Sequence, residues 1–262
     1  MKKIIQPETL ALLRNPYREE NLTLTEHDPP LLVGEVSGQV FPIIDGIPSF
    51  LQGADIPRRN RYYRWLYDRF AYVYDTVVGW GSRLKVGTET HVRAEAIATL
   101  PVKPGDKVLE TAVGTGSNTK ALPPDIEYFG VDISLNMLRK AQRNLASWDR
   151  SAKLFHADAE CLPFTDNVFD LVFQMGGLQF MSNPVKALAE LTRVAKPGTT
   201  ITVLDEAASA ARTLRRIPAL KARIRDSASA IATLPEIVPK NAESPQVEIL
   251  PSGEFYRLRF SK

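Results

Sequence analysis

Two glycines and two acidic residues near the middle of the chain have the spacing of a nucleotide-binding site. The run 107–116 reads K-V-L-E-T-A-V-G-T-G, in which an apolar stretch ends at Glu110 and is followed by Gly114 and Gly116. Glycines at such a place allow a tight turn whose backbone amides approach a ligand closely. A second apolar stretch ends at Asp132, where a carboxylate can accept hydrogen bonds from the two hydroxyls of a ribose.

The residues beside the glycines favour a cationic nucleoside over a dinucleotide. A pyrophosphate site requires a third glycine, but Gly116 is followed by Ser117, Asn118 and Thr119. The carboxylate of Glu110 would repel a diphosphate, whereas it suits a ligand that carries an ammonium and a sulfonium. The ligand that these residues imply is S-adenosylmethionine.

Three blocks in a fixed order resemble the class I methyltransferases, nearest to the ubiquinone and menaquinone C-methyltransferase type. The blocks are V-L-E-x-x-V-G-T-G, G-V-D-I-S-x-x-M-L-x-x-A and H-A-D-A-E-x-L-P-F-x-D-x-x-F-D-L-V, and the resemblance covers about residues 67–205. Their order is far more specific than any one block. One residue departs from the family: Ala112 stands where its first glycine is found, and the extra methyl group is expected to narrow the turn.

The resemblance implies cofactor contacts at the ends of three strands. Glu110 would lie near the methionine end, acting through water or backbone, Asp132 would bind the ribose, and Asp158 with Ala159 would meet the adenine. An isolated aspartate is more often a solvated turn residue or a helix cap, but three acids at one sheet edge are hard to explain that way. The predicted cofactor-binding residues are Glu110, Ala112, Gly114, Gly116, Asn118, Asp132, Ile133, Met137, Asp158, Ala159 and Met175.

Methyl transfer from a sulfonium requires mainly that the acceptor is aligned with the methyl group and that water is excluded. The sequence contains no obvious general base for this reaction. The polar candidates on the acceptor side are Tyr67, Tyr74, Gln174 and His91, with Tyr72 and Gln179 beside them. The fourth core strand is followed by Q-M-G-G-L-Q, not by the N/D-P-P-Y of enzymes that methylate exocyclic amines of bases. His91 and His156 are more simply interpreted as ordinary helix and strand residues, and Cys161 as a small buried apolar residue.

Composition sets broad limits. The 262 residues are 44% hydrophobic and carry a net charge of +3, which does not separate a small anionic substrate from nucleic acid. A single cysteine, Cys161, excludes an intramolecular disulfide and a multi-thiolate zinc site, and fits a reducing interior. With no signal peptide or membrane-length apolar run, we expect a cytoplasmic monomer or homodimer without a metal.

Residues 1–53 are predicted to form a small β-rich module, because short extended runs alternate with turn residues. Its final segment, G-Q-V-F-P-I-I-D-G-I-P-S-F-L, resembles a zinc-ribbon-like module found before some methyltransferases and in methyltransferase activator subunits. The positions that match the cysteines of those relatives are Asn15, Arg18, Gly34 and Ser37. Since none is a thiolate, no structural zinc is expected, and the module would serve as a lid or as a relic that pads the core.

Residues 54–100 are predicted to be a helical lid or linker. Arginines alternate with aromatic residues from residue 58 to residue 74, which suits either a nucleic-acid surface or an amphipathic helix packed on the core. Helical spacing explains both sets of residues, so the amphipathic helix is favoured. The segment Y-D-R-F-A-Y-V-Y-D resembles the one that lines the substrate pocket of the quinone-type enzymes. This resemblance makes Tyr67, Tyr72 and Tyr74 candidates for pocket residues.

Residues 101–262 alternate strands with helices, which predicts an α/β fold with a doubly wound, seven-stranded sheet whose last hairpin is antiparallel. Helix starts are expected at Ser134 and at Asn183-Pro184, a fourth strand over 168–173, and a helix over 207–224. The function predicted is a methyltransferase for a small organic acceptor at carbon, oxygen or nitrogen, such as a quinone or phenol. The alternatives are an RNA methyltransferase and a protein that binds S-adenosylmethionine without methyl transfer.

Overall fold

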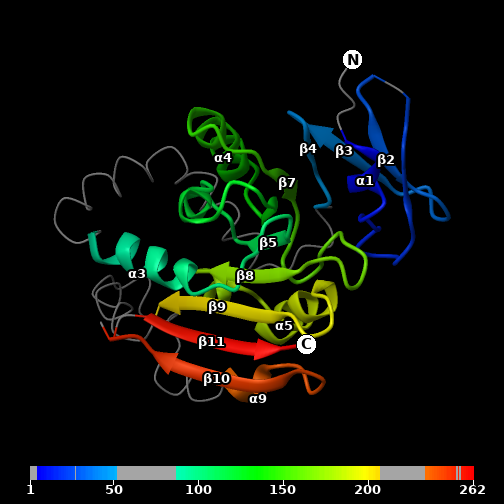
Figure 1. Cartoon of the computed structure of the whole chain (residues 1–262). Helices are drawn as coiled ribbons and strands as arrows, with labels where there is room; N and C mark the ends of the chain where they lie inside the picture. The colour runs from blue at the N-terminus through cyan, green and yellow to red at the C-terminus, as the bar shows by residue number, and fades with distance from the viewer. Residues whose placement is uncertain (1–4, 27, 52–86, 207–233, 252, 254) are drawn as a thin grey trace, which may run out of the picture.

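The computed structural model describes residues 5–26, 28–51, 87–206, 234–251, 253 and 255–262. Within these ranges the chain forms a seven-stranded sheet and a separate four-stranded antiparallel sheet (Figure 1). The elements in chain order are α1(Pro7–Leu10), β1(Leu22–Leu24), β2(Leu31–Gly34), β3(Val40–Ile44), β4(Ile47–Pro48), α3(Gly87–Ala98), β5(Lys107–Thr111), η2(Ser117–Ala121), β6(Glu127–Asp132), α4(Leu135–Ser147), β7(Lys153–His156), β8(Leu171–Met175), η3(Leu178–Phe180), α5(Pro184–Val194), β9(Thr200–Glu206), α9(Leu234–Ile237), β10(Glu243–Ile249) and β11(Phe255–Ser261).

The large sheet has the strand order β10-β11-β9-β8-β5-β6-β7. Strands β7, β6, β5, β8 and β9 pair in parallel, whereas β11 pairs antiparallel with both β9 and β10. The prediction of a doubly wound seven-stranded sheet with an antiparallel last hairpin is therefore confirmed. The order along the chain reverses between β5 and β8, so the carboxyl ends of these two strands flank the switch point where such sheets bind ligands.

Alternate side chains of each strand enter one of two cores, because successive residues of a strand point to opposite faces. On β5, Val108 packs in a core with the apolar faces of α3 and α4. Its neighbour Leu109 packs on the other face, in a core with α5 and α9. The sheet is thus covered by helices on both sides.

Local signals fix two helix starts as predicted. Ser134 caps α4 by accepting a hydrogen bond from the amide of Met137 at 3.2 Å, and Asn183 caps α5 with Pro184 in its first turn. The fourth core strand, β8, begins at Leu171, three residues later than the expected start of 168. The buried residue Val168 belongs to an apolar run, but its amide donates to the carbonyl of Val194 at 2.8 Å instead of joining the sheet.

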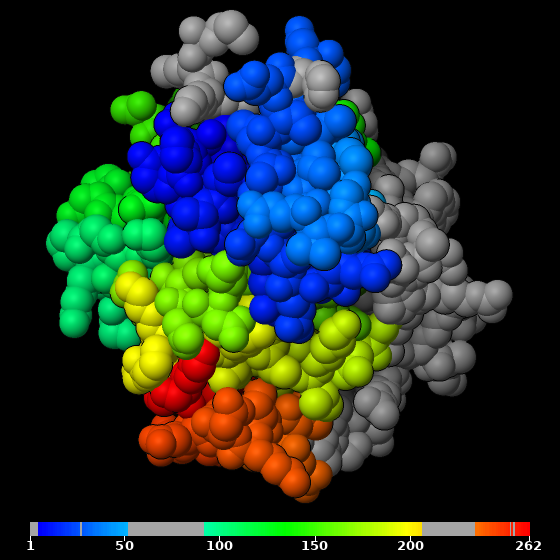
Figure 2. Space-filling view, turned by 90° about the vertical axis from the view of Figure 1, so that its right-hand side faces the viewer, coloured from blue at the N-terminus to red at the C-terminus, as the bar shows by residue number. Residues whose placement is uncertain are grey.

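The N-terminal module, with α1 and the small sheet β1–β4, packs directly on the large sheet. Figure 2 shows it as the blue region seated over the green and yellow-green segment that follows β7. Leu13 forms a β-bridge with Phe164, and the amide of Arg14 donates to the carbonyl of Pro163 at 3.1 Å. Phe41 and other module residues belong to the same buried cluster as the sheet residues of that face. The module therefore shares a hydrophobic core with the sheet.

The module also extends the large sheet at β7. Ser49 bridges His156 in parallel, and the amide of Phe50 donates to the carbonyl of His156 at 2.8 Å. The Oγ atom of Ser49 lies 2.8 Å from Nδ1 of the same histidine. Because β7 is the last strand on that side, these bonds cover part of its open edge.

The carboxylate of Glu20 lies among positions that the sequence analysis matched to cysteines of zinc-ribbon-like modules. Glu20 accepts hydrogen bonds from Nδ2 of Asn15 at 2.7 Å, from the amides of Val36 and Ser37 at 2.7 and 2.8 Å, and from the Ser37 hydroxyl. Gly34, another position that matches a cysteine, has no room for a side chain, since a Cβ there would lie 2.4 Å from Oε1 of Glu20. Three of the four cysteine-matching positions thus surround Glu20.

We predict that Glu20→Gln destabilises the module in a pH-dependent way. The hydrogen bond from the Ser37 hydroxyl, together with those from the Ser37 and Val36 amides and Asn15, lowers the pKa of Glu20 from 4.5 to about 2. A lowered pKa contributes stability above the unfolded pKa, and this stability is lost as the pH falls from 4.5 towards 2. Thermal unfolding should give a lower midpoint for the variant at pH 7 and a difference that shrinks in acid.

The matched control is Glu19→Gln, since the neighbouring Glu19 side chain is 75% exposed. It should unfold at the wild-type temperature throughout. Equal thermal unfolding midpoints for wild type and Glu20→Gln at pH 7 would contradict the prediction that the Glu20 carboxylate stabilises the module.

Candidate functional site

The carboxyl ends of β5, β6 and β7 lie side by side at one edge of the sheet. Thr111 of β5 pairs with Val131 of β6, and Asp132 at the end of β6 pairs with His156 at the end of β7. Asp158 follows β7 by two residues. The glycine turn and the acids predicted to bind ribose and adenine therefore follow three neighbouring strands, at the edge where α/β sheets bind ligands.

Asp132 ties the glycine turn to the end of β6. Its Oδ2 atom accepts a hydrogen bond from the amide of Gly114 at 2.8 Å, and its Oδ1 atom accepts one from the amide of Ser134 at 2.9 Å. The residue is 8% exposed. An acid at the carboxyl end of this strand is the group that binds the hydroxyls of a ribose in nucleotide-binding sheets.

The turn itself has three residues in the left-handed region, Ala112 (φ +55°), Gly114 (φ +54°) and Gly116 (φ +75°). A Cβ added to Gly114 would meet no atom of the described residues within 4 Å, so none of them covers the backbone at this point. The left-handed conformation costs more free energy at Ala112 than at the two glycines, because it disfavours an alanine by roughly 1 kcal/mol. A Cβ on Gly177 would lie 3.2 Å from the Cβ of Ala112, so the glycine at 177 makes room for the alanine.

Glu110 is fully buried beneath the turn. It accepts hydrogen bonds from the hydroxyl of Tyr128 and, at 2.6 Å, from Nδ2 of Asn118. Burial raises the pKa of Glu110 to about 7, although Tyr128, Asn118 and the nearby Arg93 all act to lower it. A role of Glu110 towards the methionine end of a cofactor stays a prediction, and it would have to act through neighbouring groups.

The remaining predicted cofactor residues surround this edge. Asp158 is 8% exposed and its Oδ1 accepts from the amide of Glu160 at 2.9 Å, within a turn that also holds the buried Ala159. Met137 is buried in the first turn of α4, and Met175 is buried at the end of β8.

Ile133, the residue after Asp132, is linked to the N-terminal module through His156. The Nε2 atom of His156 lies 3.1 Å from the carbonyl oxygen of Ile133, while its Nδ1 atom faces Ser49. The histidine is 3% exposed. Its contacts fit the interpretation of His156 as an ordinary strand residue and not as a base.

The acceptor-side candidates are placed only in part. Gln174 is fully buried and bonded on both sides, to the Thr111 hydroxyl at 3.0 Å and to the carbonyl of Gly176 at 3.3 Å, so it joins β5 to β8. The backbone amide of Gln179 donates a hydrogen bond to Oδ2 of Asp205 at 3.2 Å. Tyr67, Tyr72 and Tyr74 lie outside the described residues, as does the predicted helix over 207–224, and His91 belongs to α3 with its side chain outside them.

Two residues at this edge were missed by the sequence reasoning. Asp205, at the end of β9, is 2% exposed and holds the loop after β8 through Gln179. Arg93, on α3, donates from Nη1 to the carbonyl of Met175 at 3.3 Å. Asp205 directly follows the apolar run 201–204, and this was the signal in the sequence that could have pointed to it.

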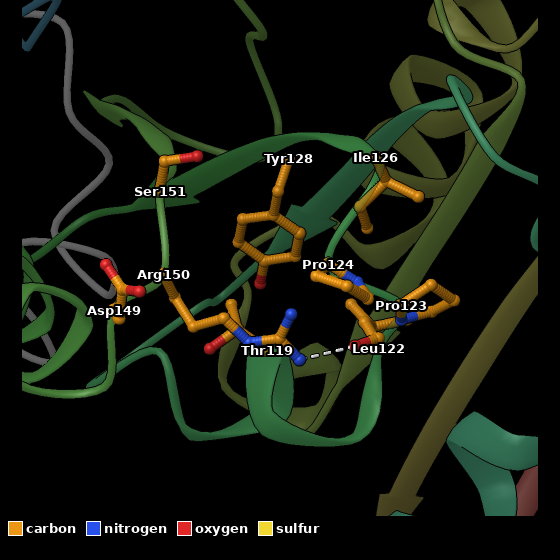
Figure 3. A pocket seen from close by; sticks show the side chains of 9 residues that line it. All are labelled: Thr119, Leu122, Pro123, Pro124, Ile126, Tyr128, Asp149, Arg150 and Ser151. Atoms are coloured by element: carbon orange, nitrogen blue, oxygen red, sulfur yellow. Dashed lines mark hydrogen bonds between the residues drawn. The ribbon is translucent and has the colours of Figure 1, made fainter.

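The pocket in Figure 3 lies away from this edge. It has a cavity volume of about 80 Å³ and is lined by the residues that lead into β6 and β7, among them Pro124 and Ser151, with the ring of Tyr128 (Figure 3). Arg150 closes one side by donating to the carbonyl of Leu122 at 2.5 Å. Because these residues precede the strands, the pocket lies at the amino ends, opposite the edge of Asp132 and Asp158.

Two features are absent from the described part of the chain. No helix there is long and apolar enough to cross a membrane. No group of three or more His, Cys, Asp and Glu side chains there could hold a metal ion.

Comparisons with known proteins agree with this geometry. Residues 109–203 match the family described as a methyltransferase domain. The chain is similar to a ubiquinone/menaquinone biosynthesis C-methyltransferase, UbiE of Burkholderia mallei (strain SAVP1), with 40% identity over 126 residues. The chain carries a class I S-adenosylmethionine-dependent methyltransferase domain. The similar segment is 47% of this chain and 52% of UbiE, so the chain spans about half the length of the curated relatives it matches.

Solved structures show the same fold for the methyltransferase domain. A protein of Methanococcus maripaludis assigned to the S-adenosyl-L-methionine-dependent methyltransferases superposes with a TM-score of 0.58 at 20% identity, over 74% of this chain and 93% of its own. The [4+2]-cyclase SpnF superposes with a TM-score of 0.56 at 19% identity, over 82% of this chain and 98% of its own. The domain implies S-adenosyl-L-methionine as the cofactor, whereas the fold alone does not decide the reaction.

We predict that Glu110 makes the stability of the protein fall between about pH 4.5 and 7. Its pKa is raised by burial, so the folded state favours the protonated acid, and the associated stability is present below 4.5 and lost as the pH rises through about 7. The Glu110→Gln variant should lack this component when denaturant unfolding is measured from pH 4 to 8. Glu127→Gln is the control, because its partner Lys153 lowers the pKa of Glu127 and moves its titration below this window.

Parallel pH profiles for wild type and Glu110→Gln would show that Glu110 titrates normally.

Proposed function

We propose that the protein transfers a methyl group from S-adenosylmethionine to a small organic acceptor. The observation that carries the proposal is the convergence of the glycine turn, Asp132 and Asp158 at one sheet edge. The similarity to a C-methyltransferase over 126 residues supports it. A cytoplasmic location remains part of the proposal.

The described residues fit an adenosyl sulfonium ligand. No described residue covers the turn at Gly114, and Asp132, which accepts a hydrogen bond from the Gly114 amide, lies where the acids of such sheets bind ribose hydroxyls. Asp158 offers an acceptor for the adenine amino group, by analogy with the family. The order of strands β7, β6 and β5 then sets the direction of the ligand, from adenine through ribose to the methionine end.

In the reaction the sulfonium supplies an activated methyl group, whose bond to sulfur breaks as the acceptor atom forms a bond to the carbon. The proton that the acceptor loses can pass to water. The protein has to hold the acceptor in line and exclude competing water, which accounts for most of the catalysis in such transfers. Gln174 and Asp205 fix the ends of β8 and β9, the strands that border the proposed acceptor side.

The acceptor class is proposed from the relatives and from the sequence. UbiE is named for C-methylation in quinone biosynthesis, which makes phenols and quinols the first acceptors to test. An RNA acceptor was motivated by the arginine and aromatic run over residues 58–74, and that run lies outside the described residues. Binding of the cofactor without methyl transfer would appear as uptake of S-adenosylmethionine with no S-adenosylhomocysteine formed.

We predict that Asp132→Ala weakens binding of S-adenosylmethionine at least tenfold. Hydrogen bonds to a charged group contribute about 1.5–3 kcal/mol each, and a factor of ten in affinity corresponds to about 1.4 kcal/mol. Isothermal titration calorimetry measures the dissociation constant, and release of labelled S-adenosylhomocysteine with phenol and quinol acceptors measures transfer.

Asp125→Ala is the control, because Asp125 is exposed at the amino end of the same strand. It should bind the cofactor as the wild type does. Binding of S-adenosylmethionine by Asp132→Ala with wild-type affinity would contradict the proposed cofactor site. Methyl transfer to RNA but to none of the small acceptors would contradict the proposed substrate class.

A further inference from the structure

Arg93 places a cation at the ends of β5 and β8, a position that no sequence motif assigned. Its Nη1 atom donates to the carbonyl of Met175, the last residue of β8, at 3.3 Å. A Cβ on the next residue, Gly176, would lie 3.4 Å from the Nη2 atom. Its helix, α3, packs against η2, which follows the glycine turn. The guanidinium therefore lies between the turn and the end of β8.

The proposed direction of the cofactor brings its amino-acid end to this place. With adenine at β7 and ribose at β6, the strand order β7-β6-β5-β8 leaves the ends of β5 and β8 for the methionyl group. That group carries an α-ammonium and an α-carboxylate. A carboxylate removed from water needs a cationic or hydrogen-bonding partner, and the forked guanidinium matches its two oxygens.

We propose that Arg93 binds the α-carboxylate of S-adenosylmethionine. The inference rests on the proposed function and adds a residue to that site. Arg93 and Glu110 are close enough to interact electrostatically, since the charge of Arg93 counters part of the rise in the pKa of Glu110. The guanidinium is complementary in charge and shape to the carboxylate of the amino-acid group.

A purely structural role is the competing explanation, because Arg93 also holds the end of β8 through Met175. The two roles differ in how they depend on the ligand. Loss of a structural contact weakens every ligand of the site, whereas loss of a carboxylate partner weakens only ligands that carry a carboxylate.

The test compares S-adenosylmethionine with decarboxylated S-adenosylmethionine, which lacks only the α-carboxylate. Calorimetry should show that Arg93→Ala lowers the affinity for S-adenosylmethionine by about 10- to 100-fold and leaves the affinity for the decarboxylated ligand at the wild-type value. Arg93→Lys should lose less, since it keeps the charge without the fork. The control is Arg143→Ala, an exposed arginine on α4, which should match the wild type for both ligands.

An equal loss of affinity for both ligands in Arg93→Ala would overturn the proposal in favour of a structural role. Unchanged binding of S-adenosylmethionine would overturn it as well. If the wild type binds neither ligand, the proposed function fails first, and this outcome is distinct from the other two because it does not involve the variant.

Discussion

The hydrogen bond from the amide of Gly114 to the carboxylate of Asp132 is the constraint on which the candidate site depends. It joins the turn after β5 to the end of β6, and the second oxygen of Asp132 fixes the start of α4 through Ser134. One carboxylate therefore positions the loop, the strand end and the helix N-terminus that surround the proposed ribose. Parallel pairing of the strands provides the frame, since it brings their carboxyl ends to one edge.

Local patterns predicted the frame well. Strand and helix alternation gave the seven-stranded sheet, and the caps Ser134 and Asn183 marked helix starts, because these signals involve residues three or four positions apart. Long-range partners could not be predicted in this way. Arg93 contacts a residue 82 positions away. Gln174 is bonded to a residue 63 positions away, and its side chain is fully buried.

In the N-terminal module a carboxylate lies among positions that the sequence analysis matched to metal-ligating cysteines. Positions that match cysteines in zinc-ribbon relatives converge in this chain on Glu20, which accepts several hydrogen bonds from both loops. A metal draws thiolates together, whereas a carboxylate draws amides and hydroxyls together, so the identity of the ligating residues changes with the charge at the centre. The residue types at 15, 34 and 37 led to the prediction that no structural zinc binds, which stays a prediction, whereas their grouping around Glu20 became visible only in three dimensions.

The covering of β7 by Ser49 and Phe50 has a consequence for how the chain can be divided. The end strand of a sheet offers unpaired backbone groups that recruit strands of other molecules. Here the module occupies part of that strand and also buries aromatic rings of the sheet, as Phe41 and Phe129 belong to one cluster. A methyltransferase domain without residues 1–53 would expose both an unpaired strand edge and an apolar surface. Both favour self-association. In this chain the module covers part of the β7 edge and the apolar face beside it.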